Sequence, residues 1–217
     1  MTTTEKMIAL LRRLKSEMNG AVTDAMRGYG GGMQGYGLNY GVSLPTIREI
    51  ARAYAPDHEL AGLLWQQDVR ELKLAALFVE DPAAVTTAQM EAWAAEWRGT
   101  ELVEQCAMQL FWRSPDALRQ AEAWAVLSGP EGAMRRLAAF YLLGKLAAAG
   151  EKVSDPAFAE LLDNTRIFGP DTTERSAVYA LREIYRHRPE LHESVFACLN
   201  RLPQPVSDEV RWQIDYL

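Results

Sequence analysis

The side chains best suited to binding chemistry lie in one stretch that combines arginine with tyrosine. Its members follow one another at intervals of four, three and four residues, so they share one face of a helix: Arg175, Tyr179, Arg182 and Arg186. Guanidinium groups bind phosphates, and an aromatic ring packs against a sugar or a base, so this face is suited to a nucleic-acid strand. A solvated arginine face, with the tyrosine lying along the surface, gives the same pattern.

Two carboxylates open a second predicted helix that begins near residue 100. Thr100 and Glu101 stand in its first turn and Glu104 follows three residues later, while Val103 and Cys106 mark the core side. Acidic side chains in a first turn stabilise a helix through its dipole by about 0.3–1 kcal/mol. Stabilisation of the helix is enough to explain both glutamates, and their spacing alone indicates a catalytic role for neither.

The residues that hold metals and cofactors do not form the required patterns. The three histidines and two cysteines lack metal-ligand spacing, and neither His-Glu-x-x-His nor Gly-x-Ser-x-Gly occurs. The glycine stretch Gly28–Gly37 has no Gly-Lys-Ser/Thr after it and no strand before it, so it is not a nucleotide-binding loop. It is interpreted as a connection, with a loop that approaches a ligand as the alternative. We therefore expect no metal and no cofactor.

Composition limits the class of protein. The 217 residues are 48% apolar and 24% charged, which is typical of a globular protein, and the net charge is −6. DNA-binding proteins are usually basic, so any cations that bind DNA must be gathered on one face. No apolar run reaches the ~20 residues of a membrane-spanning helix, and the N-terminus does not resemble a signal peptide. Two cysteines without nearby partners predict buried thiols and a cytoplasmic location.

Almost the whole chain follows the helical period, and helix starts are expected near residues 4, 45, 57, 69, 86, 100, 115, 130, 155, 172, 189 and 206. Capping residues are expected at Thr86, Ser114, Ser128 and Asp171. From Pro45 the starts recur roughly every 12–17 residues, with one wider gap after residue 130, which predicts antiparallel helix pairs. The fold class is therefore all-α, a HEAT-like helical repeat solenoid (an α-α superhelix), with an irregular bundle as the alternative.

The chain divides in this prediction into an N-terminal helix with its glycine-rich connection, residues 1–44, and a HEAT-like repeat domain, residues 45–217, that form one structural unit. All six tryptophans are assigned to the core by default. Arg48, Arg70 and Lys73 are each expected at the surface. Arg135 and Arg136 open a helix that is otherwise apolar, so at least one of them is expected to face outward.

Several segments resemble, in order and at plausible spacing, the AlkD-like family of DNA alkylation repair proteins. They cover most of the chain from about Tyr40 to Pro189, and no single one is diagnostic: Tyr40–Arg48, Leu64-Trp65, Arg70-Glu71, Val85-Thr86, Gln89-Met90-Glu91, Trp93 and Leu181-Arg182-Glu183. The resemblance implies a HEAT-like solenoid whose concave cationic groove binds duplex DNA. Enzymes of this family are glycosylases that remove N3- and N7-alkylated purines without a metal and without a base-flipping pocket. A carboxylate stabilises the developing sugar cation, aromatic rings pack against the deoxyribose, and an arginine holds the backbone.

Carried over by residue, the resemblance implies that Glu104 is the catalytic acid, where the family has aspartate. Thr100 replaces a family tryptophan, Arg136 is the arginine that holds DNA, and Tyr179 replaces the second tryptophan. Arg48, Arg175 and Arg182 join the predicted DNA-binding residues. Glutamate is longer than aspartate by one bond of about 1.5 Å, and such a displacement can cost on the order of 10²-fold in rate. DNA binding is therefore better supported than excision.

Two interpretations follow. The first is a DNA alkylation repair protein, monomeric, that binds duplex DNA and excises N3/N7-alkylated purines through Glu104. The second is a non-catalytic HEAT-repeat adaptor for branched DNA or a protein partner, which the net charge and Thr100 favour. The sequence leaves open whether the protein is an enzyme.

Overall fold

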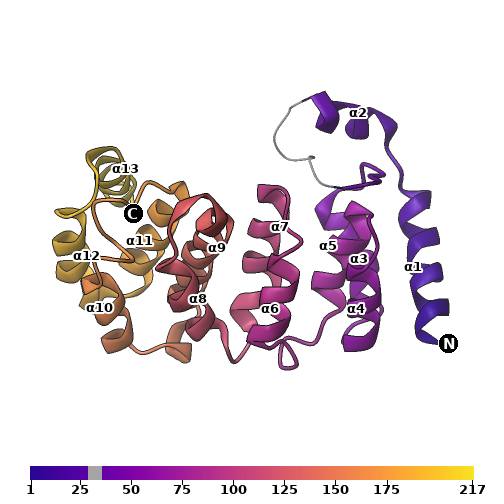
Figure 1. The fold of residues 1–217 in the computed structure, drawn as a ribbon, viewed down its shortest axis with the longest axis horizontal. Coiled ribbons are helices and arrows are strands. Elements are labelled where there is room, and N and C mark those ends of the chain that lie inside the picture. The colour runs from indigo at the N-terminus through magenta and orange to yellow at the C-terminus, as the bar shows by residue number, and fades with distance from the viewer. Residues whose placement is uncertain (29–35) are drawn as a thin grey trace. The chain divides into compact units, whose positions relative to one another are not determined.

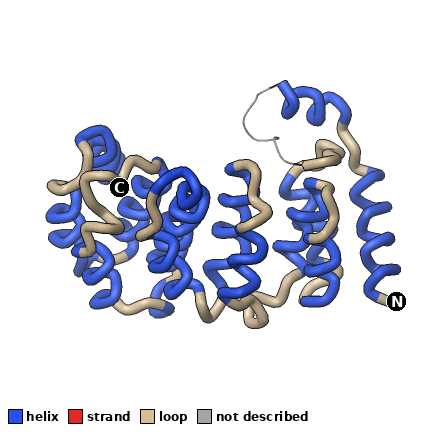
Figure 2. Tube along the Cα trace, in the orientation of Figure 1, coloured by secondary structure: helices blue, strands red, loops and turns tan. Residues whose placement is uncertain are grey.

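The computed structural model describes residues 1–28 and 36–217, so most of the predicted glycine connection lies outside the described residues. Every regular element among the described residues is a helix, and the isolated bridge between Leu38 and Val69 forms no strand (Figure 2). The all-α prediction is confirmed. The chain forms two compact units, residues 1–115 (unit 1) and 116–217 (unit 2). The predicted boundary after residue 44 stays a prediction.

Unit 1 stacks short helices side by side (Figure 1). They are α1 (Thr3–Ser16), α2 (Gly20–Gly28), α3 (Leu44–Arg52), α4 (His58–Trp65), α5 (Arg70–Val79), α6 (Thr87–Ala94) and α7 (Thr100–Gln105). A π-helical turn, η1 (Cys106–Leu110), and a 3-10 turn, η2 (Phe111–Arg113), continue α7. Helix α5 packs against α3, α4 and α7, and each of its ten residues is buried. The centre of unit 1 is therefore a single short helix.

Unit 2 repeats this arrangement around a longer central helix. Its elements are α8 (Ala117–Ala125), α9 (Gly129–Ala148), η3 (Gly150–Lys152), α10 (Asp155–Asp163), α11 (Arg175–His187), η4 (Pro189–Leu191), α12 (His192–Leu199) and α13 (Gln204–Ile214). Helix α9 packs against α8 and α11, and α11 packs in turn against α13 (Figure 1). Helices that contact their neighbours in sequence and the next pair are typical of helical repeats.

The predicted helix starts agree with the structure to within a few residues, but the predicted caps do so only in part. Thr86 accepts a hydrogen bond from the backbone N–H of Gln89, as expected of an N-cap. The prediction for Ser114 is wrong, because α8 begins after Asp116 and the Ser114 hydroxyl donates to Val85 O. Ser128 makes no capping hydrogen bond, and α11 begins after Glu174 rather than near Asp171. Helix α2 was not predicted.

Aromatic side chains fill the core of unit 1. The rings of Trp65 and Trp93 stack with centroids 4.1 Å apart and planes 3° from parallel. Both cysteines, Cys106 and Cys198, are buried free thiols, as the sequence predicts. The default assignment of every tryptophan to the core is wrong for Trp212, which is 59% exposed and packs edge-on against Tyr216.

Candidate functional site

Helix α11 separates an apolar stripe from a cationic face. Ala177, Leu181 and Ile184 are fully buried, because their spacing of three and four residues turns them all toward α9 and α13. On the other face Arg175 and Arg186 are exposed, while Tyr179 and Arg182 are partly buried. The structure therefore places the four residues of the predicted binding face along one helix of unit 2.

Tyr179 is held from three sides. Its ring lies against Gly144 of α9, its centroid is 5.6 Å from that of Tyr141, and the Arg182 guanidinium lies 5.3 Å above it. Burial, with the negative charge of Glu183, raises the pKa of Tyr179 to about 12. The hydroxyl therefore stays protonated in neutral solution and can donate a hydrogen bond.

The close approach of the Tyr179 ring depends on Gly144. A Cβ atom at position 144 would lie 2.4 Å from Tyr179 Cε1, well inside van der Waals contact. We expect Gly144→Ala to displace the ring and to lower the free energy of unfolding by about 1–3 kcal/mol, the usual cost of overpacking. Urea denaturation measures this cost. In a Tyr179→Ala background the same substitution should cost much less, and an equal cost in both backgrounds would contradict the assigned contact.

Arg182 carries a positive charge that unit 2 partly neutralises. Its Nε and Nη2 donate to Glu183 Oε1 at 2.9 and 2.7 Å, and Nη1 donates to Gln213 Oε1 at 3.3 Å. Gln213 in turn donates to Glu209. A ligand phosphate would therefore meet a guanidinium that already has a carboxylate beside it.

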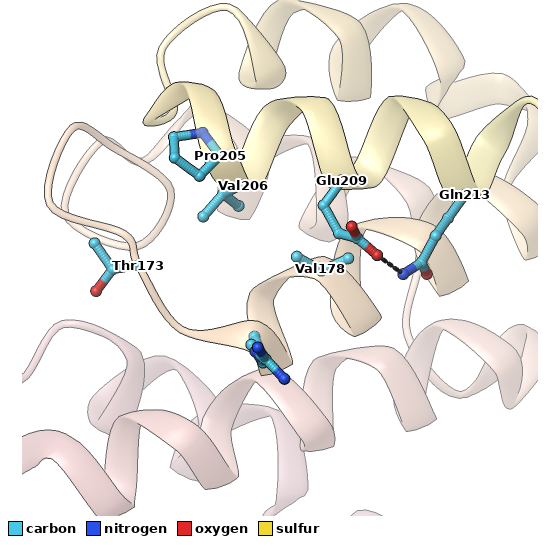
Figure 3. Close-up of a pocket in the computed structure, with 7 residues that line it drawn as sticks. Thr173, Val178, Pro205, Val206, Glu209 and Gln213 are labelled. Atoms are coloured by element: carbon cyan, nitrogen blue, oxygen red, sulfur yellow. Dashed lines mark hydrogen bonds between the residues drawn. The ribbon is translucent and has the colours of Figure 1, made fainter.

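A groove of about 590 Å³ runs between α11 and α13 (Figure 3). Glu209 and Gln213 project from α13 toward Val178 of α11, and Thr173 lines one end. Arg175 also lines the groove and makes no ion pair or side-chain hydrogen bond among the described residues. The groove is thus polar on one wall and carries one free cation.

Arg136 lies apart from this face, inside unit 2, and is only 8% exposed. Its five N–H donors are all used by acceptors of the chain: Glu174 Oε1, Ala125 O, Arg166 O, Ile167 O and Thr172 Oγ1. It ties the C-terminus of α8 to the loop before α11. Its predicted contact with DNA stays a prediction, and a phosphate would have to displace one of these acceptors.

The two glutamates of helix α7, Glu101 and Glu104, differ in their hydrogen-bond partners. Glu101 accepts hydrogen bonds from Arg70 at 2.5–3.1 Å and from the hydroxyl of Tyr36 at 3.1 Å. Glu104, one turn later, is partly exposed and makes no hydrogen bond or ion pair with any described residue. Thr100 is exposed at the start of the helix. Of the two glutamates of α7, Glu104 is therefore the one whose carboxylate stays available.

The expectation that Arg70 and Lys73 lie at the surface is wrong. They are 4% and 6% exposed, and each is paired with a carboxylate, Arg70 with Glu101 and Lys73 with Glu96 at 2.8 Å. The Arg70 guanidinium also donates to Val42 O, and Glu71 accepts from the backbone of Tyr40 and Val42. These charges hold the segment before α3 in place, so they are not free to bind a ligand.

Arg48 lies on α3 in unit 1. Its Nη2 donates to Gln109 Oε1 at 3.1 Å, and its guanidinium lies 5.3 Å above the ring of Phe78. No pattern of residues pointed to Gln109, because the π-helical turn η1 that carries it cannot be recognised from spacing. The predicted residues thus fall into two groups, Glu104 and Arg48 in unit 1 and the others in unit 2.

Residues 1–28 and 36–217 contain neither a cluster of metal-ligating side chains nor a membrane-spanning helix. No three side chains of His, Cys, Asp or Glu converge there in a way that could hold a metal ion. No helix in the same part of the chain combines the length and apolarity needed to cross a membrane.

Comparison with known proteins identifies relatives at two levels. The sequence pattern of the family described as "DNA alkylation repair enzyme" matches residues 10–197. No curated protein matches the chain significantly. The fold is similar to a solved structure described as "a new family of proteins related to the HEAT-like repeat DNA glycosylases with affinity for branched DNA structures", with a TM-score of 0.75 and 14% identity. The likeness covers 96% of this chain and 93% of that one, and it confirms the predicted HEAT-like fold.

Proposed function

Because the chain belongs to the DNA alkylation repair enzyme family, we propose that it binds duplex DNA and excises alkylated purines, with Glu104 as the catalytic carboxylate. The contrast between the two glutamates of α7 carries this proposal. Arg70 neutralises Glu101, whereas Glu104 is unpaired among the described residues and open to solvent. An unpaired carboxylate can stabilise the positive charge that develops on the sugar as the N-glycosidic bond breaks.

On this proposal the cations and aromatic ring of α11 bind DNA rather than react with it. Arg175 is free to meet a phosphate, and the Tyr179 hydroxyl is a donor beside it on the same face. The predicted concave cationic groove for duplex DNA remains part of the proposal.

The test is to incubate the protein with duplex DNA that contains 7-methylguanine. We expect free 7-methylguanine to accumulate above the spontaneous rate, slowly because glutamate replaces the family's aspartate. Binding to the same duplex without the lesion should weaken steeply as salt increases. If no base is released even at a stoichiometric amount of protein while DNA binding is intact, the proposed excision is contradicted and the proposed DNA binding is not.

A second candidate function is DNA binding without excision. Two observations favour it: Thr100 offers no aromatic wall to the sugar, and the five donors of Arg136 are used within unit 2. The structural relative has affinity for branched DNA. A four-way junction competing at least ten times better than a linear duplex of equal length, with no base released, would support this candidate over the first.

A further inference from the structure

Unit 1 contains a cluster of arginines between α3 and the end of the α7–η1–η2 segment. Arg48 reaches across from α3 to Gln109 of η1 at 3.1 Å. One helical turn after Arg48 stands Arg52, and four residues after Gln109 stands Arg113. Partial burial and the positive charge of Arg52 lower the pKa of Arg113. The guanidinium groups of Arg52 and Arg113, each four residues after a member of the Arg48–Gln109 contact, therefore repel each other.

This cluster lacks the carboxylates that pair with four other arginines of the chain. Arg70, Arg136, Arg182 and Arg188 each pair with a glutamate or an aspartate. Within the described residues, none of the three clustered arginines makes an ion pair. Glu49 lies beside Arg48 on α3, but its side chain is exposed and forms no ion pair there either. The positive charge of the cluster is therefore uncompensated by the chain.

One donor of the cluster, Nε of Arg48, is buried without an acceptor. Nη2 of the same group, by contrast, donates to Gln109. An unsatisfied buried donor costs about 1–3 kcal/mol, so native proteins seldom keep one without a reason. The neighbouring π-helical turn η1 also indicates a functional site, since such turns occur frequently at functional sites.

We propose that Arg48, Arg52 and Arg113 form a phosphate-binding site that takes backbone phosphates of duplex DNA. A phosphate has three or four acceptor oxygens, which suits guanidinium groups that approach from different elements. Its charge would remove the repulsion between Arg52 and Arg113. The choice of DNA as the source of the phosphate rests on the proposed function, whereas the anion site itself rests on the cluster.

The experiment measures duplex affinity as a function of salt for the full chain and for Arg52→Ala/Arg113→Ala. Each phosphate contact contributes roughly 0.9 to the slope of log K against log salt concentration. The double variant should flatten the slope by roughly that amount for each arginine removed. The matched control is Arg12→Ala/Arg13→Ala, which removes two exposed arginines of α1 in the same unit. The control should leave the slope unchanged.

Neither Arg52 nor Arg113 makes an ion pair among the described residues, so the double variant should keep or slightly raise the melting temperature. An unchanged salt slope in the double variant overturns the site while the proposed function stands. An equal flattening in the control also overturns it, because the effect would then follow net charge alone.

A second arm separates the two sources of phosphate. If the wild-type protein binds no duplex at any salt concentration, the proposed function fails, and inorganic phosphate then tests the site alone. A melting temperature that phosphate raises in the wild type but not in the double variant supports a site for free phosphate. Equal responses of both proteins to phosphate overturn the site as well.

Discussion

Replacing Arg136 with methionine should lower the free energy of unfolding by about 3–5 kcal/mol, the usual result of breaking a buried ion pair on one side. The substitution leaves Glu174 without its cation and removes the donors from four further acceptors, three of them backbone carbonyls. Methionine fills similar volume, so the loss reports the polar network rather than a cavity. Urea denaturation of the full chain measures it.

The matched control is Arg175→Met in the same unit. Arg175 is exposed and has no ion pair among the described residues, so its replacement should change the free energy of unfolding by less than about 0.5 kcal/mol. DNA affinity should fall more in Arg175→Met than in Arg136→Met, since Arg175 is available to a phosphate and Arg136 is not. A stable Arg136→Met protein with weakened DNA binding would instead return Arg136 to the role that the family resemblance implies.

The helices could be predicted from the sequence because their signals are local. Ser43 caps α3 ahead of Pro45, and Thr86 caps α6, so the chain marks these starts within four residues. Helix α2 escaped prediction because glycine stands at both of its ends, where it resembles the glycine stretch that follows. The predicted cap at Ser114 is wrong because its hydroxyl bonds to Val85 O instead, whereas Ser128 stands at the N-cap of α9 but makes no capping hydrogen bond.

The candidate site was harder to predict because its partners lie a repeat away in sequence. Arg70 and Glu101 are 31 residues apart, and Arg136 and Glu174 are 38 apart. No spacing rule connects such positions, so Arg70 is predicted at the surface and the sequence predicts neither ion pair. The four residues of the predicted binding face share one side of α11, because residues three and four apart on a helix lie on one face, and their contact with DNA stays a prediction.

The two glutamates of α7 provide a variant and its matched control for testing the proposed excision. Glu104→Gln removes a free carboxylate, and we expect it to lower the rate of 7-methylguanine release by about 10²–10³-fold, as loss of one electrostatic group does in other active sites. The free energy of unfolding should be unchanged, because Glu104 has no hydrogen-bond or ion-pair partner among the described residues. Duplex affinity should stay equal or increase, since a negative charge leaves the surface.

Glu101→Gln makes the same chemical change one turn earlier and should have the opposite profile. It weakens the charged hydrogen bonds to Arg70 and should lower the free energy of unfolding by about 1–3 kcal/mol. Excision by the folded protein should fall far less than in Glu104→Gln, because Glu101 acts only through the position of α7. Single-turnover rates at a temperature where both variants are folded separate the two effects. Excision that survives Glu104→Gln and disappears in Glu101→Gln would exchange the roles assigned to these residues, since the carboxylate paired with Arg70 would then be the reactive one.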